Sequence, residues 1–209
     1  MRWVAGIDAG QSGTTAVVVD EHGTIGGRGT AGAADHVDEP PGSTRCRDAC
    51  ALALARALEA AQLPADTVPV AVRIGLSGWD ERFDGVAPTF GAARVVLGHD
   101  APIALAGAVA SRPAVVVISG TGSVAYGERA DGSAIRAGGW GYLFGDEGSA
   151  FAVARDALAL AMRADDEGRR TALGDAALQH FGGHDLRTLA TSALQGRLSR
   201  SALAAFARD

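Results

Sequence analysis

The sequence lacks the features that would tie it to nucleic acid, to a membrane or to a metal cluster. Its 19 Lys and Arg residues are outnumbered by 24 Asp and Glu residues, which gives a net charge of −5. Nucleic-acid binding usually needs a basic patch, so this balance argues against it. There is no run of about 18 apolar residues that could cross a membrane. The only cysteines, Cys46 and Cys50, are too few to hold a metal or cluster by themselves, and we expect them to be buried on a helix.

The N-terminus also lacks a targeting segment. Met1 to Gly6 contains one basic residue and then reads as a strand, without the apolar stretch or the small-residue cleavage site of a signal peptide. We therefore expect a cytoplasmic protein. Hydrophobic residues make up 47% of the 209 residues, enough to build a core.

One order of elements occurs twice along the chain. Strand, glycine-rich turn, strand, hairpin turn and strand follow one another at 3–29 and again at 114–136. The residues between the repeats predict a loop at 30–43, a helix at 46–62, strands at 70–76 and 94–97, and a helix at 100–110. From about 146 onward the spacing is helical throughout. The repeat predicts two lobes, 1–112 and 113–209, of which the second has fewer strands.

The two glycine-rich turns are expected to bind phosphate. Bare amides and short hydroxyl side chains can surround an anion that larger side chains would keep away. The first turn offers Gly10, Gln11, Ser12, Gly13, Thr14 and Thr15, and the second offers Gly120, Thr121, Gly122 and Ser123. Either turn alone could be an ordinary hairpin. Neither is a Walker A loop, and the second does not open a helix as a dinucleotide-binding loop would.

Two aspartates follow apolar strands. Asp8 ends the first strand beside the first turn, where it could hold Mg²⁺ through water next to a phosphate, or simply cap the turn. Asp100 follows the strand at 94–97, where it could act as a general base toward an alcohol, or serve as the N-cap of the next helix.

The segment GGWGYLFGDEGSAF at 138–151 has the composition of a sugar site. Its glycines allow close backbone contact, and Trp140 could present an apolar face to a sugar ring. Asp146 and Glu147 could accept hydroxyl groups, although Asp146 could instead cap the helix that follows.

Five motifs, in this order, resemble one known family. GIDAGQSGTT, GHDAPIALAGA, ISGTGSVAYG, DGS and GGWGYLFGDEGSAF, spread over 6–151, resemble the BadF/BadG/BcrA/BcrD-type ATPases, and most closely their N-acetylglucosamine kinase branch. The resemblance implies an α/β protein with two ribonuclease-H-like lobes of the actin-like ATPase fold. The second lobe would be incomplete, because family members continue with more strands and a glycine-rich turn that holds adenosine.

The resemblance also implies an activity and roles for residues. It implies an ATP-dependent kinase of an amino sugar or hexose, with N-acetylglucosamine or glucosamine foremost, using ATP and Mg²⁺. Separately, an unfinished second sheet would expose a strand edge that needs a cover or a partner, so a homodimer is one expectation. Asp100 would be the catalytic base, Asp8 would serve the metal, and the two turns would be the phosphate motifs. The sugar pocket would be lined by Thr121, Gly139, Trp140, Asp146 and the backbone at Ser77 and Gly78.

Two departures from the family keep other functions open. Such kinases often use an Asn to contact the acetamido group, and this chain contains no Asn. Both cysteines fall in the first lobe, which disfavours the iron–sulfur branch of the family. The alternatives are an ATPase coupled to another process, and a non-catalytic or shortened sugar-binding or regulatory protein.

Overall fold

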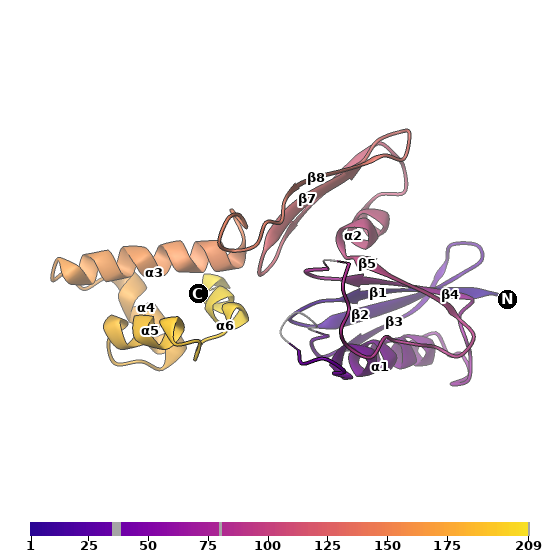
Figure 1. The fold of residues 1–209 in the computed structure, drawn as a ribbon, viewed down its shortest axis with the longest axis horizontal. Coiled ribbons are helices and arrows are strands. Elements are labelled where there is room, and N and C mark those ends of the chain that lie inside the picture. Colours follow the sequence, from indigo (N-terminus) through magenta and orange to yellow (C-terminus); the bar gives the residue numbers. More distant parts are fainter. Residues whose placement is uncertain (35–38, 80, 209) are drawn as a thin grey trace. The chain divides into compact units, whose positions relative to one another are not determined.

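The chain forms two compact units, Met1–Ser111 and Arg112–Asp209, each with its own sheet (Figure 1). This computed structural model describes residues 1–34, 39–79 and 81–208. The loop expected at 30–43 therefore lies partly outside the described residues, at 35–38. The boundary expected between 112 and 113 lies one residue from the observed division.

The first unit is built on a five-stranded mixed sheet in the order β3-β2-β1-β4-β5. β1, β2 and β3 form an antiparallel meander, and β4 and β5 extend it in parallel from β1. The strands are β1 Trp3–Ala9, β2 Thr14–Asp20, β3 Ile25–Ala31, β4 Ala71–Leu76 and β5 Arg94–His99. The predicted meander plus two further strands is confirmed.

Two helices cover opposite faces of this sheet. α1 (Arg45–Ala60) packs on β1, β2 and β3, so closely that a Cβ at Gly29 would lie 2.3 Å from the carbonyl oxygen of Ala53. α2 (Ala101–Ala108) packs on β4, where a Cβ at Gly75 would lie 2.7 Å from the Cα of Asp100. Gly29 pairs with Ala16 on β2, Ala16 pairs with Ile7 on β1, and Ile7 pairs with Ile74 on β4, so all four face α1. Since side chains alternate along a strand, Gly75 faces the sheet surface opposite to α1.

The core of the first unit lies between the sheet and α1. It is made of strand residues and the apolar stripe of the helix, among them Ile7, Val18, Val72, Ile74, Cys50, Ala53, Leu54 and Ala57. Cys46 and Cys50 are both buried on α1, as their helical spacing predicts.

The second unit has a three-stranded antiparallel sheet followed by helices. The strands are β6 Ala114–Ser119, β7 Ser123–Glu128 and β8 Ala134–Gly138, and the helices are α3 Ala150–Asp166, α4 Ala172–Phe181, α5 Leu186–Leu194 and α6 Arg200–Ala205. A 3₁₀ turn, Phe206–Arg208, ends the described chain. No strand follows Gly138 within the described residues, which agrees with the helical spacing of the sequence. None of the described helices is both long and apolar enough to cross a membrane.

The helices of the second unit enclose a core of their own. Leu158 of α3 packs with Leu186 and Leu189 of α5 and with Phe206 at the end of the described chain. The small sheet is more open, because Val115 and Val117 on its edge strand β6 are 66% and 72% exposed.

Candidate functional site

Ser77 and Asp100 lie side by side where two parallel strands end. Leu76 of β4 pairs with His99 of β5, so the residue that follows each strand stands at the same edge of the sheet. The Ser77 hydroxyl donates a hydrogen bond of 2.7 Å to Asp100 Oδ2. Asp100 occupies the N-cap position of α2, but its side chain makes no capping bond. The carboxylate is therefore held by a neighbouring strand end and not by its own helix.

Asp8 stands at the same edge, at the end of the central strand. It pairs with Gly75 on β4 and with Thr15 on β2, and the residue is exposed to solvent at this edge. Its pKa is raised above the ordinary value, chiefly because surrounding protein displaces water and also because the negative charge of Asp100 is near. Two carboxylates thus share one edge of the sheet, close enough for the charge of one to affect the other.

The two aspartates fit a magnesium ion that is held mostly by substrate. Among residues 1–34, 39–79 and 81–208 there is no group of three or more Asp, Glu, His or Cys side chains that could hold a metal. Mg²⁺ is commonly bound through one or two carboxylates, with water and substrate phosphates completing its shell. Asp8, with Asp100 beside it, suits that mode and not a cage made by the protein alone.

The first glycine turn separates into a structural part and an exposed part. The Gly10 amide donates to the Gly13 carbonyl at 3.0 Å, which closes the turn. Thr14 is 1% exposed, and its hydroxyl donates to the Gly32 carbonyl at 2.8 Å, so it fastens the turn to the chain after β3. Gln11 is half-buried, and the exposed members of the turn are Ser12, Gly13 and Thr15.

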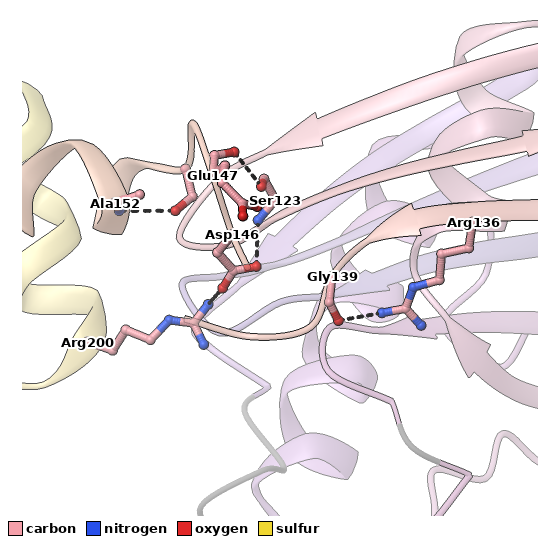
Figure 2. A network of polar contacts seen from close by, with 8 residues as sticks. Ser123, Arg136, Gly139, Asp146, Glu147, Ala152 and Arg200 are labelled. Atoms are coloured by element: carbon pink, nitrogen blue, oxygen red, sulfur yellow. Dashed lines mark hydrogen bonds and ion pairs between the residues drawn. The ribbon is translucent and has the colours of Figure 1, made fainter. Parts of the chain in front are cut away.

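The second glycine turn is fastened to the segment before α3 (Figure 2). The Ser123 amide donates to Asp146 Oδ1 at 3.0 Å, and the Ser123 hydroxyl donates to the Glu147 carbonyl at 2.8 Å. The Gly120 amide donates to the Gly122 carbonyl at 2.9 Å. Both donors of Ser123 therefore serve the fold of the unit, whereas Thr121, which is half-buried like Ser123, has its hydroxyl in neither of these bonds.

Asp146 is buried inside this network. The residue is 4% exposed and has a left-handed backbone, with φ of 64°. Its Oδ2 forms an ion pair of 3.2 Å with Arg200 on α6, 54 residues away (Figure 2). Ser149 caps α3 by accepting from the Ala152 amide, so Asp146 is not the helix cap.

Arg200 is the functional candidate that sequence reasoning missed. Its position at the start of a short helix resembles that of any exposed arginine, and only the fold brings it to Asp146. No local spacing could have identified it.

The segment between β8 and α3 takes a shape that glycine makes possible. Gly138, Gly139 and Gly141 have φ of 73°, 69° and 80°, a region that residues with side chains rarely adopt. The Gly139 carbonyl accepts from Arg136 Nη2 at 2.8 Å (Figure 2). Trp140 is 77% exposed. The segment therefore presents an exposed aromatic side chain next to a backbone carbonyl that Arg136 holds.

The predicted residues gather separately within each unit. Asp8, Ser77 and Asp100 lie near one another at the sheet edge of the first unit, with the first turn beside them. Gly78 follows Ser77 with φ of 76°. Asp146 is joined to the second turn in the second unit, and Gly139 and Trp140 stand in the same connecting segment.

Proteins of known structure share this fold. A solved structure from Chromobacterium violaceum, named as a candidate N-acetylglucosamine kinase, matches with a TM-score of 0.82 and 31% identity over 100% of this chain and 73% of that chain. A ROK family glucokinase from Streptomyces griseus, solved with glucose and AMPPNP, matches with a TM-score of 0.50 and 19% identity over 98% of this chain and 74% of that one. The likenesses confirm the expected fold class, an α/β protein with two ribonuclease-H-like lobes of the actin-like ATPase fold.

A curated relative covers a shorter stretch. The N-acetylmuramic acid/N-acetylglucosamine kinase of Clostridium acetobutylicum is 42% identical over 81 residues, which are 38% of this chain and 26% of that protein. The match to it thus spans about a quarter of the relative. The profile of one family, in contrast, matches residues 5–207. The chain belongs to the BadF/BadG/BcrA/BcrD ATPase family.

Proposed function

We propose that the chain is an ATP-dependent kinase of an amino sugar or hexose, with N-acetylglucosamine or glucosamine the foremost substrates. The observation that carries the proposal is the position of the Asp100 carboxylate at the end of a strand. Its Oδ2 accepts a hydrogen bond of 2.7 Å from the Ser77 hydroxyl, and its side chain makes no capping bond to α2. A base fixed in this way can meet a substrate hydroxyl at low cost in reorganisation. The names of the relatives from C. violaceum and C. acetobutylicum support the same activity.

In the proposed reaction Asp100 takes the proton of one sugar hydroxyl. The hydroxyl oxygen then bonds to the γ-phosphorus of ATP while the bond to the bridging oxygen breaks, so that a sugar phosphate and ADP are formed. A positioned base of this kind contributes about 10²–10⁴-fold to rate. Ser77 orients the base, and its hydroxyl bond to Oδ2 leaves Oδ1 as the oxygen that meets the substrate.

The exposed groups of the two glycine turns would bind the phosphates of ATP. Ser12, Gly13 and Thr15 of the first turn and Thr121 of the second are the groups best placed, because Thr14 and Ser123 are already bonded within the fold. Asp8 would hold Mg²⁺ together with the phosphates, and the ion would supply charge neutralisation on the transferred group.

The sugar would lie against Trp140 and the backbone at Gly139, with Thr121 and Asp146 offering polar contacts. Aromatic rings suit the apolar face of a sugar, and Trp140 is exposed enough to present one. The carboxylate of Asp146 would keep its bonds to Ser123 and Arg200, so its contact with a hydroxyl would use the remaining lone pairs. Gly78, next to Ser77, would bring a second stretch of backbone to the sugar.

One observation favours a second function, a sugar-binding or regulatory protein without efficient turnover. The second sheet has three strands, and its edge strand exposes Val115 and Val117. A nucleotide base needs apolar surroundings for affinity, and this small sheet leaves apolar residues of its own exposed. An ATPase coupled to another process is the remaining alternative from the same family.

A coupled assay for ADP across a panel of sugars would separate these functions. The kinase predicts ADP release that depends on sugar and Mg²⁺ and falls with Asp100→Asn. Sugar-independent ADP release would favour the ATPase. Sugar binding by calorimetry without any ADP release would favour the non-catalytic protein. Comparing N-acetylglucosamine, glucosamine and glucose would also show whether a chain without Asn distinguishes the acetamido group.

A further inference from the structure

Two contacts in sequence join α6 to the second glycine turn. Arg200 Nη2 lies 3.2 Å from Asp146 Oδ2, and Asp146 Oδ1 accepts the Ser123 amide at 3.0 Å (Figure 2). Arg200 is the first residue of α6, whereas Ser123 is the first residue of β7. One carboxylate therefore bridges a helix near the end of the described chain and the backbone of the turn.

The burial of Asp146 makes its counter-ion important. The residue is 4% exposed, and an ionised carboxylate in such surroundings needs both hydrogen bonds and an opposite charge. Removing one partner of a buried ion pair leaves an uncompensated charge, which is far more costly than exchanging the whole pair. Arg200, with its side chain 29% exposed, supplies that opposite charge.

The turn also packs directly on the ion pair. A Cβ at Gly122 would lie 2.7 Å from Arg200 Nη2 and 2.9 Å from Asp146 Oδ2, so the backbone here rests against both charged groups. The guanidinium stands 5.5 Å from the centre of the Tyr142 ring, a cation–π arrangement that fixes its place. Its Nε is buried and has no hydrogen-bond partner among the described residues.

We infer that Arg200 is a positioning residue for the second glycine turn, and that it offsets the charge of Asp146 where nucleotide phosphate would bind. The first half of this inference concerns the free protein alone, and the second half rests on the proposed function of the turn. Without Arg200, the Ser123 amide would be bonded to an uncompensated anion, which would repel phosphate. α6 therefore contributes a residue to the proposed phosphate-binding turn, in addition to packing in the core of the unit.

The first half is tested by NMR on the unliganded chain. Arg200→Met removes the charge and keeps much of the side-chain volume, and Arg200→Lys keeps the charge without the planar fork. Arg197→Met is the matched control, because Arg197 is exposed and precedes α6. We expect the Ser123 amide proton to shift and to exchange faster in Arg200→Met, to change less in Arg200→Lys, and to stay unchanged in Arg197→Met. An unaltered Ser123 amide in Arg200→Met would overturn the inference.

The second half is tested by calorimetry with ATP and with inorganic tripolyphosphate. We expect Arg200→Met to weaken binding of both by on the order of ten-fold, since one negative charge is left without its partner. The double variant Arg200→Met with Asp146→Asn should recover most of that loss, because it removes the uncompensated charge, which a purely structural defect would not allow. Equal affinity of Arg200→Met and the parent for both probes would overturn the electrostatic role.

The two proposals fail separately in these experiments. A Ser123 amide that responds to Arg200 in a chain that phosphorylates no sugar would support the positioning role and refute the kinase. Normal turnover by Arg200→Met would refute the positioning role and support the kinase. If Arg200→Met does not fold, the test uses Arg200→Lys instead. A Ser123 amide signal identical to that of the parent in Arg200→Lys would show that the planar guanidinium is not needed to position the turn.

Discussion

The Ser77 hydroxyl donates a hydrogen bond of 2.7 Å to Asp100 Oδ2 across 23 residues of sequence. The bond joins the ends of two neighbouring parallel strands, β4 and β5, and it fixes a carboxylate that would otherwise rotate freely. Gly75 makes the arrangement possible, because any side chain there would collide with the Cα of Asp100. The rotamer of the proposed base is thus set by the sheet.

The first prediction is that Asp100→Asn strongly lowers the rate of phosphoryl transfer without destabilising the protein. The change removes the base and keeps the shape, and its expected cost is about 10²–10⁴-fold in kcat. Thermal stability should change little, because the Asp100 side chain makes no capping bond to α2. Steady-state kinetics and a melting curve check both parts.

The control for this experiment is Ser77→Ala. It should lower kcat by a smaller factor than Asp100→Asn and leave the KM for sugar nearly unchanged, because Ser77 only orients the base. Wild-type turnover by Asp100→Asn would show that another group takes the proton. A melting temperature that fell by many degrees would show that Asp100 has a structural role after all.

The second prediction concerns the sign of the Asp8 charge effect on stability. The pKa of Asp8 is raised in the folded protein by displaced water and by Asp100, so ionised Asp8 destabilises the fold at neutral pH. In metal-free buffer Asp8→Asn should therefore melt at a higher temperature than the parent at pH 7. The difference should shrink as pH falls toward about 4, where an unfolded Asp is half protonated, and should vanish below that pH. Urea unfolding at several pH values measures this, and a less stable Asp8→Asn at pH 7 would contradict the assignment.

The third prediction compares two glycines of the second turn. Gly122→Ala places a methyl group within 3 Å of Arg200 and Asp146, and it should cost about 1–3 kcal/mol as an overpacked site. Gly120→Ala meets nothing within 4 Å and should be tolerated. Denaturant unfolding of both variants checks the comparison. Equal stability of the two would mean that the turn does not rest on the ion pair.

The fourth prediction concerns the apolar side chains between β8 and α3. Trp140 and Phe144 are 77% and 84% exposed, so replacing either with Ala should leave thermal stability unchanged. Trp140→Ala should weaken sugar binding several-fold, because it removes the proposed stacking surface, whereas Phe144→Ala serves as the exposed aromatic control. Calorimetry with N-acetylglucosamine, glucosamine and glucose measures the effect. Unchanged affinity of Trp140→Ala for every sugar that binds the parent would remove Trp140 from the site.

Asp146→Ala cannot serve the same purpose. It would break the bonds to Ser123 and Arg200 as well as any bond to sugar, and loss of one partner of a buried pair costs about 3–5 kcal/mol. A fall in sugar affinity should therefore be larger than for Trp140→Ala, and it would report on the network as well as on the pocket.

The fifth prediction concerns the open edge of the second sheet. β6 is an edge strand, and Val115 and Val117 on it are exposed. Unpaired edges of this kind associate with other strands, so the 209-residue chain should self-associate in a concentration-dependent manner. Val117→Lys should shift the equilibrium toward monomer, and sedimentation velocity measures it. A parent chain that stays monomeric at every concentration would contradict this.

Local sequence patterns were enough to predict the elements of the fold and the neighbourhood of the site. Alternating apolar residues and glycine turns specify the repeated meander, because strand periodicity and left-handed turns are local properties of a few residues. The exposed Trp140 and the strand-end positions of Asp8 and Asp100 could be read in the same way. The motifs that carry the family resemblance lie within these local elements.

Which side chains meet could not be predicted in this way, because the contacts join distant parts of the chain. Ser77 reaches Asp100 across 23 residues, and Arg200 reaches Asp146 across 54. Thr14 appears available in the sequence of the first turn, yet the fold buries its hydroxyl against the Gly32 carbonyl. Such contacts depend on strand register and helix packing, which no short stretch of sequence encodes, so the bonding of a polar side chain follows from the whole chain and not from its own motif.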